Sequence, residues 1–169
     1  MKKIYIGIDP GFSGGIVRIG ITDHNQATVL DKLPMPLVKS AGKNRVDLYR
    51  VHQILNDWVM SASAITEFII EEVGSMPGQG LSSTFRFGYY AGALDGIVSA
   101  FALPTTFVRP QAWMKVCLEG ISRAEPKPSR IFCKNRYPYE SFLATSRSKI
   151  AHDGMTDACA IAHYLYLKK

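Results

Sequence analysis

The stretch IYIGIDPGFSGG at positions 4–15 decides how the rest of this chain is interpreted. Isoleucine recurs at every second position from 4 to 8, the period that indicates a β-strand, and Asp9-Pro10-Gly11 then forces a turn. A carboxylate therefore ends a strand that is expected to be buried. Because a buried ionised Asp needs compensation, Asp9 is either a turn-capping residue or the partner of a cation or metal ion.

The composition favours one soluble, intracellular domain over residues 1–169. Hydrophobic residues make up 47% of the 169 positions, enough for a substantial core. No apolar run approaches the roughly 20 residues of a membrane helix, and the chain enters its first strand without a signal-peptide pattern. The cysteines at 117, 133 and 159 form no CxxC pair, so we expect reduced packing residues rather than a disulfide framework or a zinc site.

The hydrophobic pattern predicts an α/β fold. Strands are expected over 4–8, 15–21, 27–33, 68–73 and 105–108, helices over 48–59, 83–103, 129–135 and 155–167, and loops over 34–43 and 137–149. A serine at 82 or 83 is expected to cap the long second helix. The first three strands form an antiparallel meander, and right-handed crossovers place the last two parallel to the first. The expected product is a five-stranded mixed sheet flanked by helices.

Acidic residues mark two further elements. Glu71 and Glu72 end the fourth strand, and only one of them can share the face of Asp9, because adjacent strand residues point to opposite faces. Asp153 and Asp157 are four apart at the start of the last helix and project from one face. The preference for acids at a helix N-terminus also explains Asp153. Asp157 precedes an apolar run and needs a counter-ion.

The net charge of +6 is unevenly distributed. Between positions 109 and 149, nine basic residues occur against three acidic ones. The candidates for DNA binding in this segment are Arg109, Lys115, Arg123, Arg130 and Lys134. The aromatic residues interleaved with them are Trp113, Phe132, Tyr137, Tyr139 and Phe142. Such a stripe suits a phosphate backbone with exposed bases, although a charge run is also typical of a solvated face.

Four segments together resemble the RuvC-type Holliday-junction resolvases of the ribonuclease H-like superfamily, particularly their phage-associated branch. The segments are IGIDPG at 6–11, IIEEVGSMPGQG at 69–80, PQAWMK at 110–115 and HDGMTDACAIA at 152–162. They span nearly the whole chain in the expected order and spacing. The resemblance implies a ribonuclease H-like fold and a crossover junction endodeoxyribonuclease in the cytoplasm of a bacterial or phage-infected cell.

The resemblance also implies the site. The metal-binding carboxylates that it implies are Asp9, Glu71, Asp153 and Asp157. Glu71 is preferred over Glu72 because the family's glutamate directly follows the apolar strand residues. Lys127 is the implied basic residue beside the scissile phosphate, with Lys115 as the second candidate and a plain backbone contact as the alternative role of Lys115.

Four carboxylates suit a pair of hard cations. We expect two Mg²⁺ ions, replaceable by Mn²⁺, and no small-molecule cofactor. Two such ions about 3.5–4 Å apart activate a water and stabilise the leaving alkoxide. Asp9 is expected to bridge the ions and Glu71 and Asp157 to flank one each. Asp153 is expected to complete the site directly or through water.

Two departures from the family pattern affect these assignments. The last two acids are four apart rather than three, with Gly154 between them, which leaves open whether His152 shares the role of Asp153. Both spacings keep the two positions on one side of a helix. The family's aromatic wedge falls near Gly74, where Met76 is the candidate substitute.

The expected partner is branched DNA, in particular four-way junctions, with no membrane involved. Symmetrical cutting of two strands of like polarity suits a homodimer. The helix over 83–103 is the candidate interface, through Arg86, Tyr89 and Tyr90, with core packing as the other role of the two tyrosines.

Three alternatives come from other classes. The IGIDPG turn also resembles the phosphate loop of the actin and sugar-kinase superfamily, but 169 residues leave no room for the second domain that encloses nucleotide. A non-catalytic binder of branched DNA would show no metal-dependent cutting. A related nuclease acting on flaps, forks or RNA hybrids would share the predicted site.

Overall fold

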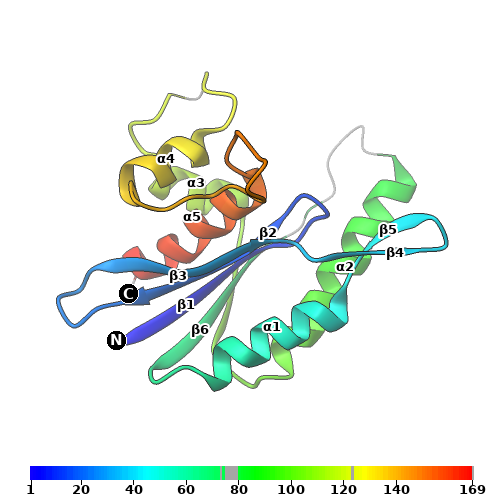
Figure 1. Cartoon of the computed structure of the whole chain (residues 1–169), viewed down its shortest axis with the longest axis horizontal. Helices are drawn as coiled ribbons and strands as arrows, with labels where there is room; N and C mark the ends of the chain where they lie inside the picture. The colour runs from blue at the N-terminus through cyan, green and yellow to red at the C-terminus, as the bar shows by residue number, and fades with distance from the viewer. Residues whose placement is uncertain (73, 75–79, 123, 169) are drawn as a thin grey trace.

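The computed structural model describes residues 1–72, 74, 80–122 and 124–168 (Figure 1). The strands are β1 (Lys3–Asp9), β2 (Gly15–Ile21), β3 (Ala27–Pro34), β4 (Leu37–Ser40), β5 (Lys43–Val46), β6 (Ile65–Glu71) and β7 (Thr105–Val108). The helices are α1 (Leu48–Met60), α2 (Leu81–Ser99), α3 (Pro110–Cys117), α4 (Pro128–Arg136) and α5 (Asp153–Lys168). A five-stranded sheet has the order β3-β2-β1-β6-β7, and β4 and β5 form a separate pair. The predicted mixed sheet is confirmed, because β1 to β3 are antiparallel and β6 and β7 run parallel to β1.

The sheet separates two apolar cores, one on each face (Figure 1). The isoleucines at 4, 6 and 8 belong to the core under α1 and α2, together with Phe68 and Leu94. Tyr5 and Ile69 belong to the opposite core, under α3, α4 and α5. Since side chains alternate along a strand, the later odd-numbered residues of β1 and β6 also face α5.

Glycine allows α5 to lie directly against β1 and β2. A Cβ atom at Gly7 would lie 2.2 Å from the carbonyl oxygen of Ala158, and one at Gly154 would lie 2.2 Å from the backbone carbon of Gly14. Gly14 and Gly154 also form an isolated β-bridge. The first turn of α5 is thereby held against the loop that follows Asp9.

The segment predicted as a loop over 34–43 is largely a β-hairpin made of β4 and β5. Its two turn residues, Ala41 and Gly42, have φ values of 49° and 73°, the sign that a type I′ turn requires. The prediction was wrong because Ala-Gly is a weaker signal of this turn than Asn-Gly or Asp-Gly, and because Pro34 and Pro36 suggested irregular structure.

Three other local predictions need correction. Helix α3 was not predicted, although Pro110 at its first position is a favourable start. Helix α2 begins at Leu81 after Gly80 and makes no side-chain cap bond, so the serine cap at 82 or 83 was wrong. Strand β6 spans Ile65–Glu71 rather than 68–73, and Val73 lies outside the described residues.

The cysteines are free and buried, as predicted. The segment over 137–149 has no helix or strand, as expected, but it is anchored by buried Phe142. None of the helices that the structure describes is long and apolar enough to span a membrane.

Replacing Gly7 by alanine is expected to destabilise the protein by about 3 kcal/mol or more, because the new methyl group meets the backbone of α5. The matched control is Gly96→Ala on α2, where nothing lies within 4 Å of the added Cβ. This control should raise the free energy of unfolding by about 0.5–1 kcal/mol. Urea unfolding measures both. Equal midpoints for the two variants would contradict the close packing of α5 on β1.

Candidate active site

Asp9 and Glu71 end neighbouring parallel strands. The register of β1 and β6 runs as far as Ile8 opposite Ile70, so the two acids follow side by side at one edge of the sheet. Both have the odd-numbered parity that faces α5. Glu72 instead forms an ion pair with Arg109, with 3.2 Å between Oε2 and Nε. The structure therefore places Glu71, rather than Glu72, on the side of Asp9.

Asp157 reaches the same edge from α5. The contact between Gly14 and Gly154 fixes the first turn of α5 beside the loop after Asp9, and Asp157 follows within the next turn. The run after it, residues 158–162, is fully buried against the sheet, as its small apolar side chains predicted. Residues from β1, β6 and α5 that are far apart in the sequence thus meet at one place.

The carboxyl groups of these acids raise one another's pKa. Burial, followed by the charges of Glu71 and Asp157, raises the pKa of Asp9 to about 8. Burial raises the pKa of Glu71, and Asp157 adds to the rise. Burial also raises the pKa of Asp157, and Asp153 adds to it. Without a cation, each carboxyl group is harder to ionise because it is buried beside other acids.

Two neutral side chains hold these acids in place, and sequence reasoning assigned neither of them this role. The indole Nε1 of Trp113 donates a hydrogen bond of 2.8 Å to Oε1 of Glu71. Buried Ser129 donates a 3.1 Å hydrogen bond to the Thr156 hydroxyl, which itself donates to the Asp153 carbonyl. The Ser129 side chain also lowers the pKa of neighbouring Asp157. The only sequence signal for Trp113 was its place in the PQAWMK motif.

The Asp153 carboxylate forms ion pairs with two basic side chains. Its Oδ2 lies 3.0 Å from Nζ of Lys127, and its Oδ1 lies 2.7 Å from Nε of Arg130. The charge of Lys127 also lowers the pKa of both Asp9 and Asp157. We call Asp9, Glu71, Asp153 and Asp157 the acidic cluster. The expected role of Lys127 beside a scissile phosphate stays a prediction. Arg130, expected on DNA, pairs with Asp153 of this cluster.

The donor set fits hard divalent cations in its chemistry. Carboxylate oxygens are the ligands that Mg²⁺ and Mn²⁺ prefer, and a cation would relieve the repulsion among Asp9, Glu71 and Asp157. Within the part of the chain that the structure describes, no three His, Cys, Asp or Glu side chains lie close enough together to hold a metal ion as they stand. A bound metal would therefore have to draw the carboxylates inward.

His152 has a structural contact of its own. Its Nδ1 accepts a 3.4 Å hydrogen bond from the backbone N–H of Met155, and its backbone N–H donates to Phe142. The ring therefore caps the N-terminus of α5.

The other predicted DNA-binding residues lie elsewhere. Lys115 and Lys134 are exposed, and among the described residues neither forms an ion pair. Met76 and Arg123 lie outside the described residues.

The expectation of a stripe of exposed aromatic rings was wrong for most of its members. The buried ones are Trp113, Phe132, Tyr137 and Phe142, and all four pack in the core under α5. Tyr137 is further fixed by a 2.7 Å hydrogen bond to Nδ1 of His163. Tyr139 alone among the five is exposed, at 99%. Trp113 packs from α3 and Phe132 from α4, whereas Tyr137 and Phe142 pack from the chain after α4, so these four rings serve the core.

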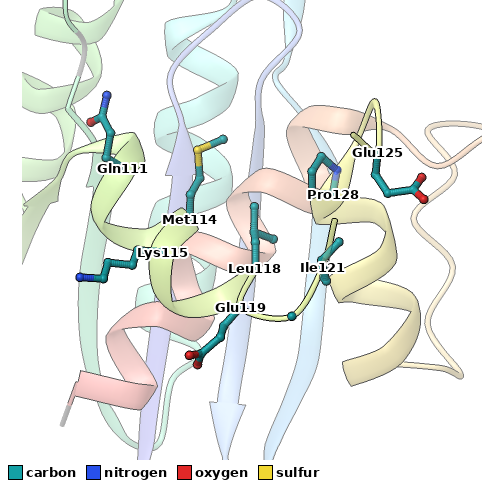
Figure 2. Close-up of a pocket in the computed structure, with 9 residues that line it drawn as sticks. Gln111, Met114, Lys115, Leu118, Glu119, Ile121, Glu125 and Pro128 are labelled. Carbon is teal, nitrogen blue, oxygen red and sulfur yellow. The ribbon is translucent and has the colours of Figure 1, made fainter. Parts of the chain in front are cut away.

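A separate pocket of about 760 Å³ lies beside α3 (Figure 2). Apolar side chains of Met114, Leu118 and Pro128 point toward its centre, while the Lys115 amine and the Glu119 carboxylate point outward (Figure 2). None of the predicted metal-binding carboxylates lines it. Lys115 thus belongs to the rim of this pocket rather than to the acidic cluster.

No protein-family model and no curated protein matches the sequence. Solved structures match over nearly its whole length. RuvC of Thermus thermophilus in complex with a Holliday junction substrate has a TM-score of 0.68 and 16% identity, covering 95% of this chain and 91% of that one. A second structure of Thermus thermophilus RuvC gives 0.64 and 16% identity, covering 98% and 95%. The yeast mitochondrial Holliday junction resolvase Ydc2 gives 0.50 and 10% identity, covering 96% and 77%. The chain has the ribonuclease H-like fold of these proteins.

In the absence of divalent metal, the free energy of unfolding should fall as the pH rises from about 4 to about 8. Native Asp9 keeps a proton up to about pH 8, whereas the unfolded chain releases it near the ordinary value of 3.8, so the native state binds more protons in this range. One such group contributes a slope of up to about 1.4 kcal/mol per pH unit. Asp9→Asn should flatten the curve when urea unfolding is repeated across this range. Parallel curves for the two proteins would show that Asp9 ionises normally.

Proposed function

We propose that this protein is a Mg²⁺-dependent endodeoxyribonuclease that resolves four-way and related branched DNA. The observation that carries the proposal is the meeting of Asp9, Glu71 and Asp157 at one sheet edge, where each is half-buried and its pKa is raised by another acid. The fold likeness supports the choice of substrate, since one of the matched structures holds RuvC with a Holliday junction substrate. The sequence motifs point the same way.

Three carboxylates would hold the metal. Asp9 has the central place, because the charges of both Glu71 and Asp157 act on it. A pair of Mg²⁺ ions, or Mn²⁺ in their place, supplies an activated water and stabilises the leaving oxygen of the phosphodiester. The residues of this chain supply the rest: Trp113 orients Glu71 through the indole hydrogen bond, and the Ser129 side chain favours the charged form of Asp157.

Lys127 and Asp153 form the polar side of the proposed site. The ammonium of Lys127 lies 3.0 Å from the Asp153 carboxylate and is 49% exposed, so it can turn toward a phosphate that enters from solvent. Asp153 keeps its partner Arg130 when Lys127 moves. In this proposal Lys127 neutralises the scissile phosphate, and Asp153 acts on the metal directly or through water.

The proposal includes a homodimer, which places two such sites on one junction. Exposed apolar residues recur at every fourth position of α2: Leu81 is 90% exposed, Phe85 74% and Tyr89 58%. On a helix, residues four apart share one face. Tyr90 is buried in the core, in edge contact with Phe12, and Arg86 lies over the Phe12 ring. The face of Phe85 and Tyr89 is therefore the proposed subunit contact.

From the resemblance to the phage-associated branch we also propose where the protein acts. The protein would act in the cytoplasm of a bacterial or phage-infected cell, on junctions formed by recombination or repair.

Asp9→Asn, Glu71→Gln and Asp157→Asn should each reduce Mg²⁺-dependent nicking of a synthetic four-way junction by at least about a thousandfold, because each removes a charge that the ions need. Junction binding should stay within a few-fold. The matched control is Glu72→Gln, which removes the neighbouring carboxylate and should keep most of the activity. Three-way, flap and RNA-hybrid substrates in the same assay test the substrate class. Full activity in any of the three variants would remove that residue from the site.

Phe85→Glu should shift the protein from dimer to monomer in sedimentation velocity, because it places a charge in the proposed contact. At a junction the monomer should nick one strand without the paired second cut. Tyr49→Glu, at a residue of α1 that is 72% exposed, serves as the control and should remain dimeric. A Phe85→Glu protein that dimerises as the wild type does would rule out this face of α2.

A further inference from the structure

The hairpin of β4 and β5 stands apart from the sheet. It projects beyond the sheet on the side away from the two termini (Figure 1). Its strands pair from Leu37 opposite Val46 to Ser40 opposite Lys43, and every residue of both strands except Val46 is exposed. Both turn residues have positive φ, so the turn is tight and the hairpin has a defined end.

The hairpin carries basic residues and no acid. Over positions 36–46 the sequence is PLVKSAGKNRV, with Lys39, Lys43 and Arg45 as its charged residues. All three are exposed, and none of them forms an ion pair within the described part of the chain. Lys43 and Arg45 are two apart on β5 and therefore share one face. The hairpin is thus a cationic arm whose charges are free to meet an anion.

The base of the hairpin is fixed beside the acidic cluster. Pro34, the last residue of β3, pairs with Gly15, which itself pairs with Asp9. The next residue, Met35, donates a 2.9 Å backbone hydrogen bond to Gly14. A second bond of 2.9 Å, from the Asp47 N–H to the Pro36 carbonyl, closes the base. The arm therefore starts at the edge where the carboxylates meet and extends away from it.

We infer that this hairpin binds the phosphate backbone of a duplex arm of the DNA whose scissile phosphate lies at the acidic cluster. The inference rests on the proposed function and adds to it a DNA contact outside the basic segment of 109–149. Four-residue strands reach roughly 13 Å, which carries the cations from the site onto the adjoining duplex. A two-stranded ribbon also matches the width of a DNA groove. When lysine and arginine side chains without an ion-pair partner bind phosphates, counterions are released from the DNA. This release drives binding.

The first test is the salt dependence of binding. A variant with Lys39, Lys43 and Arg45 all replaced by serine should bind a long-armed four-way junction about tenfold more weakly at low salt, with a log–log salt slope shallower by up to about 2.7. The control removes two exposed charges at the opposite edge of the sheet, by serine at Lys2 and Lys168, and leaves Lys3 in its ion pair with Glu67. It should lower the slope by less than one. Equal thermal melting of the two variants shows that both are folded.

The second test locates the hairpin on the DNA. All three native cysteines are buried, so a thiol-reactive photocrosslinker reacts selectively with a cysteine introduced as Ser40→Cys beside the turn. The crosslinker attached at position 40 should form adducts with nucleotides in a duplex arm, away from the junction centre. The control is His24→Cys in the turn between β2 and β3, at the opposite edge, which should give no adduct.

The outcomes separate this inference from the proposed function. A wild-type protein that neither binds nor nicks branched DNA would overturn both. If the wild type binds and nicks, but the hairpin variant keeps its affinity and salt slope and Ser40→Cys gives no adduct, the hairpin inference alone fails. It also fails if the hairpin variant loses dimerisation and its salt slope is unchanged, because the hairpin would then be a subunit contact.

Discussion

Repulsion among three half-buried carboxylates is the interaction on which the proposed site depends. Asp9, Glu71 and Asp157 are supplied by separate elements, and burial together with their neighbours' charges raises the pKa of each. A fold optimised for stability alone would not bring such groups together, because burying unpaired charge is unfavourable. A bound divalent cation would offset this cost, and this is the physical reason for the catalytic role that we propose for the edge.

The packing that forces the acids together comes from residues with no side chain. Gly7 and Gly154 let the backbone of α5 approach β1 and the loop after it, at distances that any Cβ would prevent. This explains why a glycine separates Asp153 and Asp157 in the sequence. Asp153 then turns toward Lys127 and Arg130 instead of toward Asp9.

Much of the fold followed from the sequence because its signals are local and repetitive. The alternation in β1 and the apolar run after Asp157 fixed which residues are buried, and the crossover rule fixed strand direction. The roles of Trp113 and Ser129 did not follow, because hydrogen bonds between distant segments leave no periodic signal. The exposed aromatic stripe failed because aromatic residues between charges fit a half-buried helix as well as a binding surface. The β4–β5 hairpin was missed because its turn depends on a positive φ at Ala41, which the residue type does not favour.

A crystal structure with Mn²⁺ tests the central claim most directly, since anomalous scattering locates the ions without reference to activity. We expect two peaks at the edge where β1, β6 and α5 meet, held by Asp9, Glu71 and Asp157, with these side chains drawn closer together than they lie in the present structure. Peaks held by other residues, or an empty edge at saturating Mn²⁺, would contradict it.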